Sequence, residues 1–240
     1  MVSRRTSAQV AEVNASSITS GSIAYQAGDT IIVYVFKDGG SAVSMTDSAG
    51  GLGFWDHIGE SIALSGYACC RISQTASATI TFTNSTTAHL SMAIFVYSAV
   101  NQISKHWTEP YNDLDTAAIA AGKFSENKRR YEGVESLAVG GTITADAYHG
   151  GAFPTDIIAL FCCVLLGGNP TAAPNQTNGG LTTVFTQNGS VKWSISELVG
   201  GSDFNSNQIH WATSSTTLVD AFCLIVALTT HTEPRYLENG

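Results

Sequence analysis

The chain has 240 residues, of which 44% are hydrophobic and only 12% are charged, and its net charge is −8. This length suits one large all-β domain or two small ones. So few charged residues suit a surface that is buried against neighbouring subunits, and suit a monomeric cytosolic enzyme less well. The acidic balance argues against direct binding of nucleic acid, and no apolar run is long enough to span a membrane or to follow the basic start as a secretion signal.

The first half of the chain predicts strands. Residues 1–20 are polar and rich in Ser and Thr, which predicts an extended arm or a first edge strand. Ile31–Phe36 is a short apolar run that follows Gly28-Asp29 and ends before further glycines, as is typical of a strand buried in a β-sandwich. Other strands of this half are predicted from alternation or apolar content over residues 43–46, 62–72, 79–83 and 91–100.

The second half repeats this plan at an offset of about 128 residues, which is typical of a duplicated unit. Asp29 and Asp156 each open an apolar run, and Gly-Gly-Leu recurs at positions 50–52 and 179–181. The same offset matches Phe82 with Trp211. Strands are predicted in this half over residues 157–166, 182–186, 190–198, 208–212 and 218–228. We therefore predict two related halves of about four strands each, at about residues 21–100 and 151–230.

Residues 101–150 have no counterpart of equal length, so we predict an insertion there. Asp113–Arg130 is its best helix candidate, with Asp115 as the N-cap, and residues 142–145 predict a strand. The fold class that follows is all-β: a jelly-roll-like antiparallel β-sandwich. It has an extended N-terminal arm over residues 1–20 and a single domain over residues 21–240.

No pattern of reactive side chains predicts an active site. The adjacent pairs Cys69-Cys70 and Cys162-Cys163 point to opposite sides of a strand, so we expect buried, reduced thiols. The six histidines lack metal-ligand spacing, and there is no Gly-x-Ser-x-Gly elbow. Asp203–Asn207 has the alternating oxygens of a calcium loop without the Gly and Glu that complete one, and its binding of a cation is left open. We expect no catalytic residue, cofactor or metal.

Basic and aromatic residues outside the repeat are the candidates for partner contacts. The basic ones form either a solvated surface or an arm and a loop that dock on an acidic neighbouring subunit. Trp107 lies just past a predicted strand and is the aromatic residue best placed for the surface, whereas Trp193 and Trp211 fall within strands and are expected in the core. The candidate residues are Arg4, Arg5, Trp107, Lys128, Arg129 and Arg130.

Parts of both halves resemble a known family. Ala27–Val33 and then Val43–Gly50 resemble a widespread phage module, whose pattern is an apolar strand after Gly-Asp followed by Ser-Asp-Ser-x-Gly. Phe95–Val100 resembles the Glu-Tyr-Ser-Gly-Val exit of that module, with Val96 in place of the acid and Ala99 in place of the glycine. The similarity spans most of residues 20–228. It implies a phage virion or tail-associated β-sandwich protein that acts in structure and assembly, and it carries over no catalytic residues.

We therefore expect a non-enzymatic structural component of a bacteriophage virion, assembled in the host cytoplasm, that is tail- or fibre-associated or decorates the capsid. It would form a homo-oligomer, contact other virion proteins and exchange residues 1–20 between subunits. The alternative is a carbohydrate- or host-receptor-binding module, an adhesin, that recognises a surface glycan through loop aromatics. A third class is a polysaccharide-degrading enzyme with two carboxylates drawn from Glu60, Glu109, Glu197 and Glu233.

Overall fold

In the computed structural model of the chain, every regular element that is described is a β-strand, and every strand pairing is antiparallel. The predicted all-β, antiparallel sandwich class is confirmed. The chain divides into two compact units, Val2–Val100 and Asn101–Gly240, the latter with Met1. The structure describes residues 1–50, 52, 55–60, 63–69, 72–104, 132–137, 142–146, 157–166, 170–177, 179–199, 208–212, 214 and 219–229.

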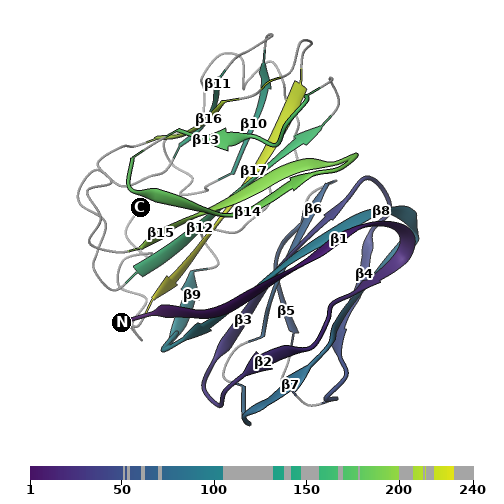
Figure 1. Cartoon of the computed structure of the whole chain (residues 1–240), viewed down its shortest axis with the longest axis vertical. Coiled ribbons are helices and arrows are strands. Elements are labelled where there is room, and N and C mark those ends of the chain that lie inside the picture. Colours follow the sequence, from purple (N-terminus) through teal and green to yellow (C-terminus); the bar gives the residue numbers. More distant parts are fainter. Residues whose placement is uncertain are drawn as a thin grey trace. The chain divides into compact units, whose positions relative to one another are not determined.

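The Val2–Val100 unit is built around one large sheet, whose strand order is β1-β8-β3-β6-β5 (Figure 1). The strand β4 pairs with β8 off this path, and β2 and β7 form a separate two-stranded ribbon. The strands are β1 (Ser3–Thr19), β2 (Ile23–Tyr25), β3 (Thr30–Lys37), β4 (Ala42–Asp47), β5 (Trp55–Glu60), β6 (Leu64–Cys69), β7 (Ala76–Ala78) and β8 (Ile80–Ser98).

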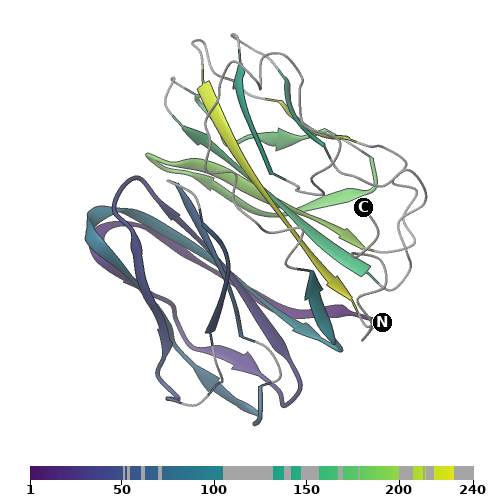
Figure 2. The same ribbon diagram turned by 180° about the vertical axis from the view of Figure 1, so that it is seen from behind.

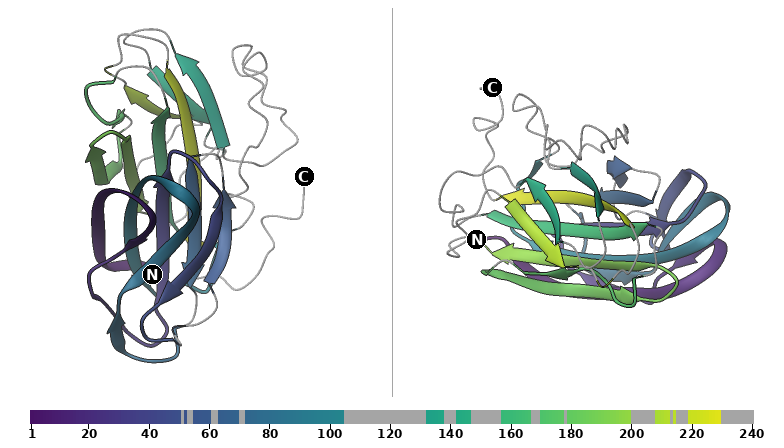
Figure 3. Two further views of the ribbon diagram at one scale, coloured as in Figure 1. Left: turned by 90° about the vertical axis from the view of Figure 1, so that its right-hand side faces the viewer. Right: turned by 90° about the horizontal axis from the view of Figure 1, so that it is seen from above.

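Two long strands, β1 and β8, belong to both layers of this unit. The first part of β8 pairs with β4 and with the end of β1, and its second part pairs with β3 and with the start of β1. The β1–β8 ladder shifts register between Val10 and Val13 and between Ala15 and Ser17. Such bulges bend a strand, and strands that bend are a common way to pass from one layer of a sandwich to the other. Figures 2 and 3 show the two strands curving together.

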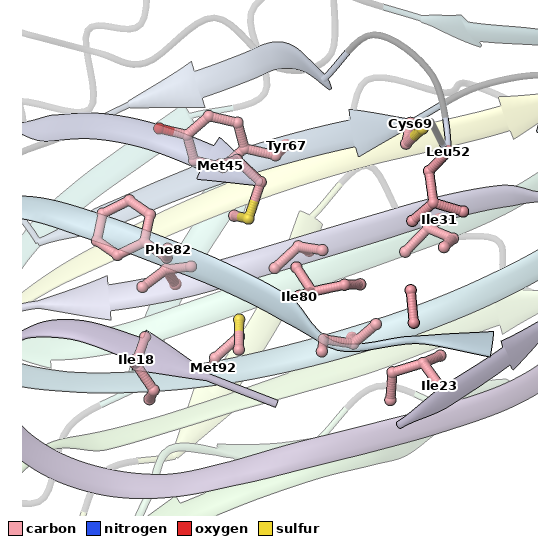
Figure 4. Close-up of a cluster of buried hydrophobic side chains, with 14 of the residues drawn as sticks. Ile18, Ile23, Ile31, Met45, Leu52, Tyr67, Cys69, Ile80, Phe82 and Met92 are labelled. Carbon is pink, nitrogen blue, oxygen red and sulfur yellow. The ribbon is translucent and has the colours of Figure 1, made fainter. Parts of the chain in front are cut away.

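The hydrophobic core of the unit lies between its layers. Ile18, Phe82 and Met45 form one row across the neighbouring strands β1, β8 and β4, and all three belong to the buried cluster that also contains Ile31 and Met92. Figure 4 shows their side chains directed toward a common interior. Since burying one such side chain contributes about 1.5–3 kcal/mol, this cluster stabilises the sandwich.

The strand β3 is buried along its whole length. Ile31, Val33 and Val35 belong to the core cluster, and the intervening side chains of Ile32 and Tyr34 are also inaccessible to solvent. A strand that is covered on both faces has no polar side to present. This explains why its sequence is a continuous apolar run and does not alternate.

The Asn101–Gly240 unit contains a sheet of order β10-β17-β12-β15-β14, with β9 paired to β17, and a smaller sheet of order β11-β16-β13. Its strand β12 is buried on both faces over residues 158–165, as β3 is in the first unit. The strands are β9 (Gln102–Ser104), β10 (Glu132–Leu137), β11 (Thr142–Asp146), β12 (Ile157–Leu166), β13 (Asn175–Gln176), β14 (Leu181–Asn188), β15 (Lys192–Val199), β16 (Gln208–Ala212) and β17 (Val219–Thr229).

The two units have the same strand order. The strands β10, β17, β12, β15 and β14 take the places that β1, β8, β3, β6 and β5 hold in the first unit. Trp211 pairs with Ile143 on one side and with Gln176 on the other, just as Phe82 lies between β1 and β4. This match agrees with the sequence offset between Phe82 and Trp211, while duplication as the origin of the two units stays a prediction.

Three boundaries differ from the expectations drawn from the sequence. Residues 3–19 form an edge strand that pairs with β8, and not an extended arm, because Ala8, Val10 and Ile18 pack against the core. Residues 132–137 and 142–146 supply β10 and β11 to the sheets, so they are not an insertion outside them. The chain divides at Val100 into two compact units, where the sequence predicted a single domain over residues 21–240. The helix expected at residues 113–130 lies outside the described residues.

The residue that follows β8 has an unusual backbone conformation. Ala99 follows β8 with a φ of 59°, in the left-handed region that glycine adopts without strain and other residues adopt at a cost. Alanine therefore introduces strain at the exit of the longest strand of the fold.

We predict that Ala99→Gly keeps or raises stability, by up to about 1 kcal/mol, because relief of the left-handed strain outweighs the greater flexibility of glycine in the unfolded chain. The matched control is Ala24→Gly, an exposed position paired with Ser77 in the middle of β2, which should lower stability by about 0.5–1 kcal/mol. Urea unfolding measures both. An equal loss for the two variants would contradict the strain at Ala99.

Candidate functional site

The first strand, β1, forms one edge of the main sheet of its unit. Among the described strands it pairs with β8 alone, so no described strand bonds the backbone N–H and C=O groups of its other side. Its 17 residues are about three times the usual length of a strand. It contains neither Lys nor Pro, the residues that often discourage pairing at exposed edges. An open edge of this kind is a surface on which another strand can form hydrogen bonds.

The side chains of β1 are small and mostly uncharged on both faces. Thr6, Ala8 and Val10 lie opposite core residues of β8 and are half-buried. Ser7 and Gln9 lie on the other face and are exposed. No bulky side chain in this segment would keep an approaching strand away from the edge.

Arg5 fastens the start of β1 to the start of β3. Its Nε donates to Asp29 Oδ2 at 2.8 Å and its Nη2 donates to Asp29 Oδ1 at 3.1 Å. The Asp29 side chain is only 2% exposed, and it also accepts a hydrogen bond from the backbone N–H of Gln26. Gly28 lies in the turn between Gln26 and Asp29, and its φ of 85° suits glycine. A bidentate, charge-assisted pair fixes both the position and the orientation of its two side chains. Arg5 therefore fastens the start of β1 to the start of β3.

A second polar contact joins β1 to β8 on the face away from the core. His89 Nδ1 lies 2.7 Å from Glu12 Oε1, and the backbone N–H of His89 donates to Asp38 Oδ1 at 2.8 Å. His89 is the neighbour of Leu90, which points into the core, and successive residues of a strand point to opposite faces. Glu12 is thereby held on the outer face of the sheet.

A small polar cluster lies at the edge of the core, where Trp55 Nε1 donates to Asp47 Oδ2 at 3.3 Å. Asp47 Oδ1 and the hydroxyl of Tyr25 are buried and have no hydrogen-bond partner among the described residues. Burial raises the pKa of the Tyr25 hydroxyl above its ordinary value of 10.0, and the nearby Asp47 carboxylate and Cys69 raise it further. The raised pKa favours the neutral form of Tyr25, as suits a side chain of the buried cluster.

Of the predicted partner-binding residues, the structure describes Arg4 and Arg5. Arg4 is exposed on β1, opposite Tyr97 of β8, and Arg5 is paired with Asp29. Of the residues expected at the surface or in a cation site, the following lie outside the described residues: Trp107, Lys128, Arg129, Arg130 and Asp203–Asn207.

Several expected core residues lie where the sequence places them. Trp193 and Trp211 are fully buried, which removes them from any sugar-binding platform. The described thiols of Cys69, Cys162 and Cys163 are buried and form no disulfide. The sequence did not single out Glu12 or His89. The alternation of small apolar and polar side chains over residues 6–10 is a local signal from which β1 could have been predicted.

In the part of the chain that the structure describes, no three His, Cys, Asp or Glu side chains are grouped so that they could hold a metal ion. No helix among the described residues is long and apolar enough to cross a membrane.

No protein-family model matches the chain, and no match is found among curated proteins. Among solved structures, one of Sulfolobus Turreted Icosahedral Virus is similar at 9% identity and a TM-score of 0.28, covering 99% of this chain and 92% of that one. Recombinant pro-11S globulin of pumpkin is similar at 6% identity and a TM-score of 0.23, covering 96% and 86%. Oxalate decarboxylase from Bacillus subtilis follows at 6% identity and a TM-score of 0.15, covering 90% and 70%. At these values none of the similarities transfers a function.

We predict that Arg5→Ala lowers the free energy of unfolding by about 1–3 kcal/mol, because it leaves the buried Asp29 carboxylate without its charged donor. Asp29→Ala should cost at least as much, and the double variant should cost less than the two single losses together. The exposed neighbour supplies the control: Arg4→Ala should stay within about 0.5 kcal/mol of the parent. Equal effects of Arg4→Ala and Arg5→Ala in urea unfolding would contradict the anchoring role.

We predict that Tyr25→Phe changes the alkaline stability of the protein. Since the pKa of Tyr25 is higher in the folded state than its ordinary 10.0, its contribution is complete below pH 10 and is lost as the pH rises from 10 toward the folded-state value. The phenylalanine variant should match or exceed the parent at pH 7, because an unpartnered buried hydroxyl is removed. Urea unfolding at pH 7, 9 and 11 should show a smaller loss for the variant, and identical losses would refute this assignment.

Proposed function

We propose that the protein is a non-enzymatic structural component of a bacteriophage virion, either tail- or fibre-associated or a decoration protein of the capsid. It works by oligomerising and by contacting other virion proteins. On this proposal the chain assembles in the host cytoplasm, needs no cofactor, and binds neither nucleic acid nor membrane directly.

The observation that carries this proposal is that polar side chains of the first unit contact one another within the chain. Three polar contacts between side chains close within the chain: Arg5 with Asp29, Glu12 with His89, and Trp55 with Asp47. They join strands of one sandwich. What remains for a partner is the strand surface itself, which is rich in Ser, Thr, Ala and Asn. Surfaces of this kind suit packing against neighbouring subunits, since few charges must lose their hydration.

The sequence supports the same conclusion independently. The motifs that follow Gly28-Asp29 and lead out of β8 resemble those of phage virion proteins. The low share of charged residues fits a chain whose surfaces are buried against neighbouring subunits. The adhesin alternative depends on exposed aromatics. Trp193 and Trp211 are buried as expected and cannot serve it, which leaves Trp107, outside the described residues, as its candidate.

The test is the location of the protein in purified virions. Antibodies against the chain, detected with gold particles in electron microscopy, should label particles at a fixed site, and a cryo-EM reconstruction should place the sandwich as a repeated density there. Labelling of the tail or of the capsid shell then separates the two sites of action. Virions that lack the chain altogether, while the infected cell contains it, would overturn the proposal.

A further inference from the structure

We propose that the outer edge of β1 is an interface with a second copy of this chain, in which the two β1 strands pair antiparallel about a two-fold axis through Ala8. This inference rests on the proposed function, because it identifies the surface through which the protein oligomerises. Addition of a strand to an open sheet edge is a common mode of recognition, in which the backbone supplies the hydrogen bonds.

The bulges of β1 define where such pairing is possible and where its centre lies. The ladder with β8 shifts register between Arg4 and Thr6 and again between Val10 and Val13. Thr6–Val10 is therefore a regular segment with an irregularity at each end, and Ala8 is its midpoint. An antiparallel pair centred on Ala8 aligns the regular segment of one copy with that of the other. It also places the bulge of each copy opposite the bulge at the other end.

The small side chains of this segment complement themselves in that register. Ser7 lies opposite Gln9 of the second copy on the outer face, and Thr6 lies opposite Val10 of the second copy on the core side. Ala8 meets its own counterpart at the axis. The outer face therefore pairs exposed polar side chains, and the core side pairs half-buried ones. A two-fold interface requires this self-complementarity, because one patch must fit itself.

The charges of β1 select the same register. The strand has charged residues only at Arg4, Arg5 and Glu12, and Arg5 is engaged with Asp29. With Ala8 at the axis, Arg4 lies opposite Glu12 of the second copy, and symmetry makes this contact twice. Arg4 pairs with Tyr97, one residue beyond the core residue Val96, and Glu12 binds His89, so both charges lie on the outer face. Opposite charges across a strand pair favour a register and disfavour its alternatives.

The contacts that already hold β1 make it a rigid template. Arg5 is fixed to Asp29 at one end of the regular segment, and Glu12 is held by His89 at the other. A partner strand therefore meets an edge that is already ordered, which lowers the entropy lost on association. The second copy brings the same ordered edge, and this is why we assign the occupant as another molecule of this chain.

Site-directed cross-linking of the full-length chain tests the register. Chains carrying Ser7→Cys and chains carrying Gln9→Cys, with tags of different size, are mixed and oxidised. Residues directly opposite in an antiparallel pair are separated by roughly 4.5–5.5 Å between Cα atoms, which a disulfide spans, whereas the diagonal pair of two Ser7 positions lies about 7–8 Å apart. The cross-linked dimer that contains one chain of each kind should make up more than half of all cross-linked dimers, which is the share expected from random pairing. The parent chain, whose described thiols are buried, controls for linkage through native cysteines.

Charge reversal supplies a second readout. Arg4→Glu should weaken dimerisation roughly tenfold in sedimentation or light scattering, since two like-charged contacts are created, and the swap Arg4→Glu with Glu12→Arg should recover part of that loss. Arg4→Gln is the matched control and should weaken dimerisation less. Circular dichroism checks that each variant is folded.

The outcomes separate this inference from the proposed function. A chain that is monomeric at high concentration, or that cross-links Ser7 to Ser7 as readily as to Gln9, overturns the pairing even if the protein is found in virions. A chain that cross-links in the expected register but is absent from virions retains the pairing and removes the proposed virion role.

Discussion

The long pairing of β1 with β8 is the contact on which the Val2–Val100 unit depends. The strand β8 runs through both layers, next to β3 in one and next to β4 in the other. On its remaining side β1 pairs with both parts of β8, with shifts of register between them. Ile18 of β1 fills the core row beside Phe82. The bidentate pair of Arg5 and Asp29 then fixes the start of β1 to the start of β3. The Arg5–Asp29 pair and one row of apolar side chains thus hold β1 in place, although its sequence is polar and rich in Ser and Thr.

The strands that sequence reasoning placed best are those with the strongest apolar signal. The run opened by Asp156 predicts residues 157–166, which are the bounds of β12, and the run after Asp29 predicts β3 to within a residue at each end. Both strands are covered on two faces, so their burial leaves a continuous apolar trace in the sequence. The long strand β8 was expected as two strands, because the polar residues 84–87 interrupt its apolar character where it bends between layers.

The nature of β1 was harder to derive from the sequence, because its core-facing residues are small and only half-buried. Alanine at positions 8 and 15 fits either an arm or an edge strand, and tertiary pairing decides between them. The role of Arg5 was also hidden, since a sequence displays a charge without the carboxylate that meets it after folding. The candidate surface therefore emerged from strand pairing and bulge positions, while composition had indicated only that the protein has faces to cover.

Residue-resolved amide hydrogen exchange along β1 tests the central claim most directly, because it reports both edges of the strand. In an antiparallel strand, alternate residues hydrogen-bond to opposite sides. The account predicts that the amides of Ser3–Thr19 directed toward β8 exchange slowly at every concentration, and that the intervening amides within Thr6–Val10 become protected only when the protein self-associates. Fast exchange along the whole of β1, as in a free arm, would contradict the account, as would self-association that leaves the amides of Thr6–Val10 unchanged.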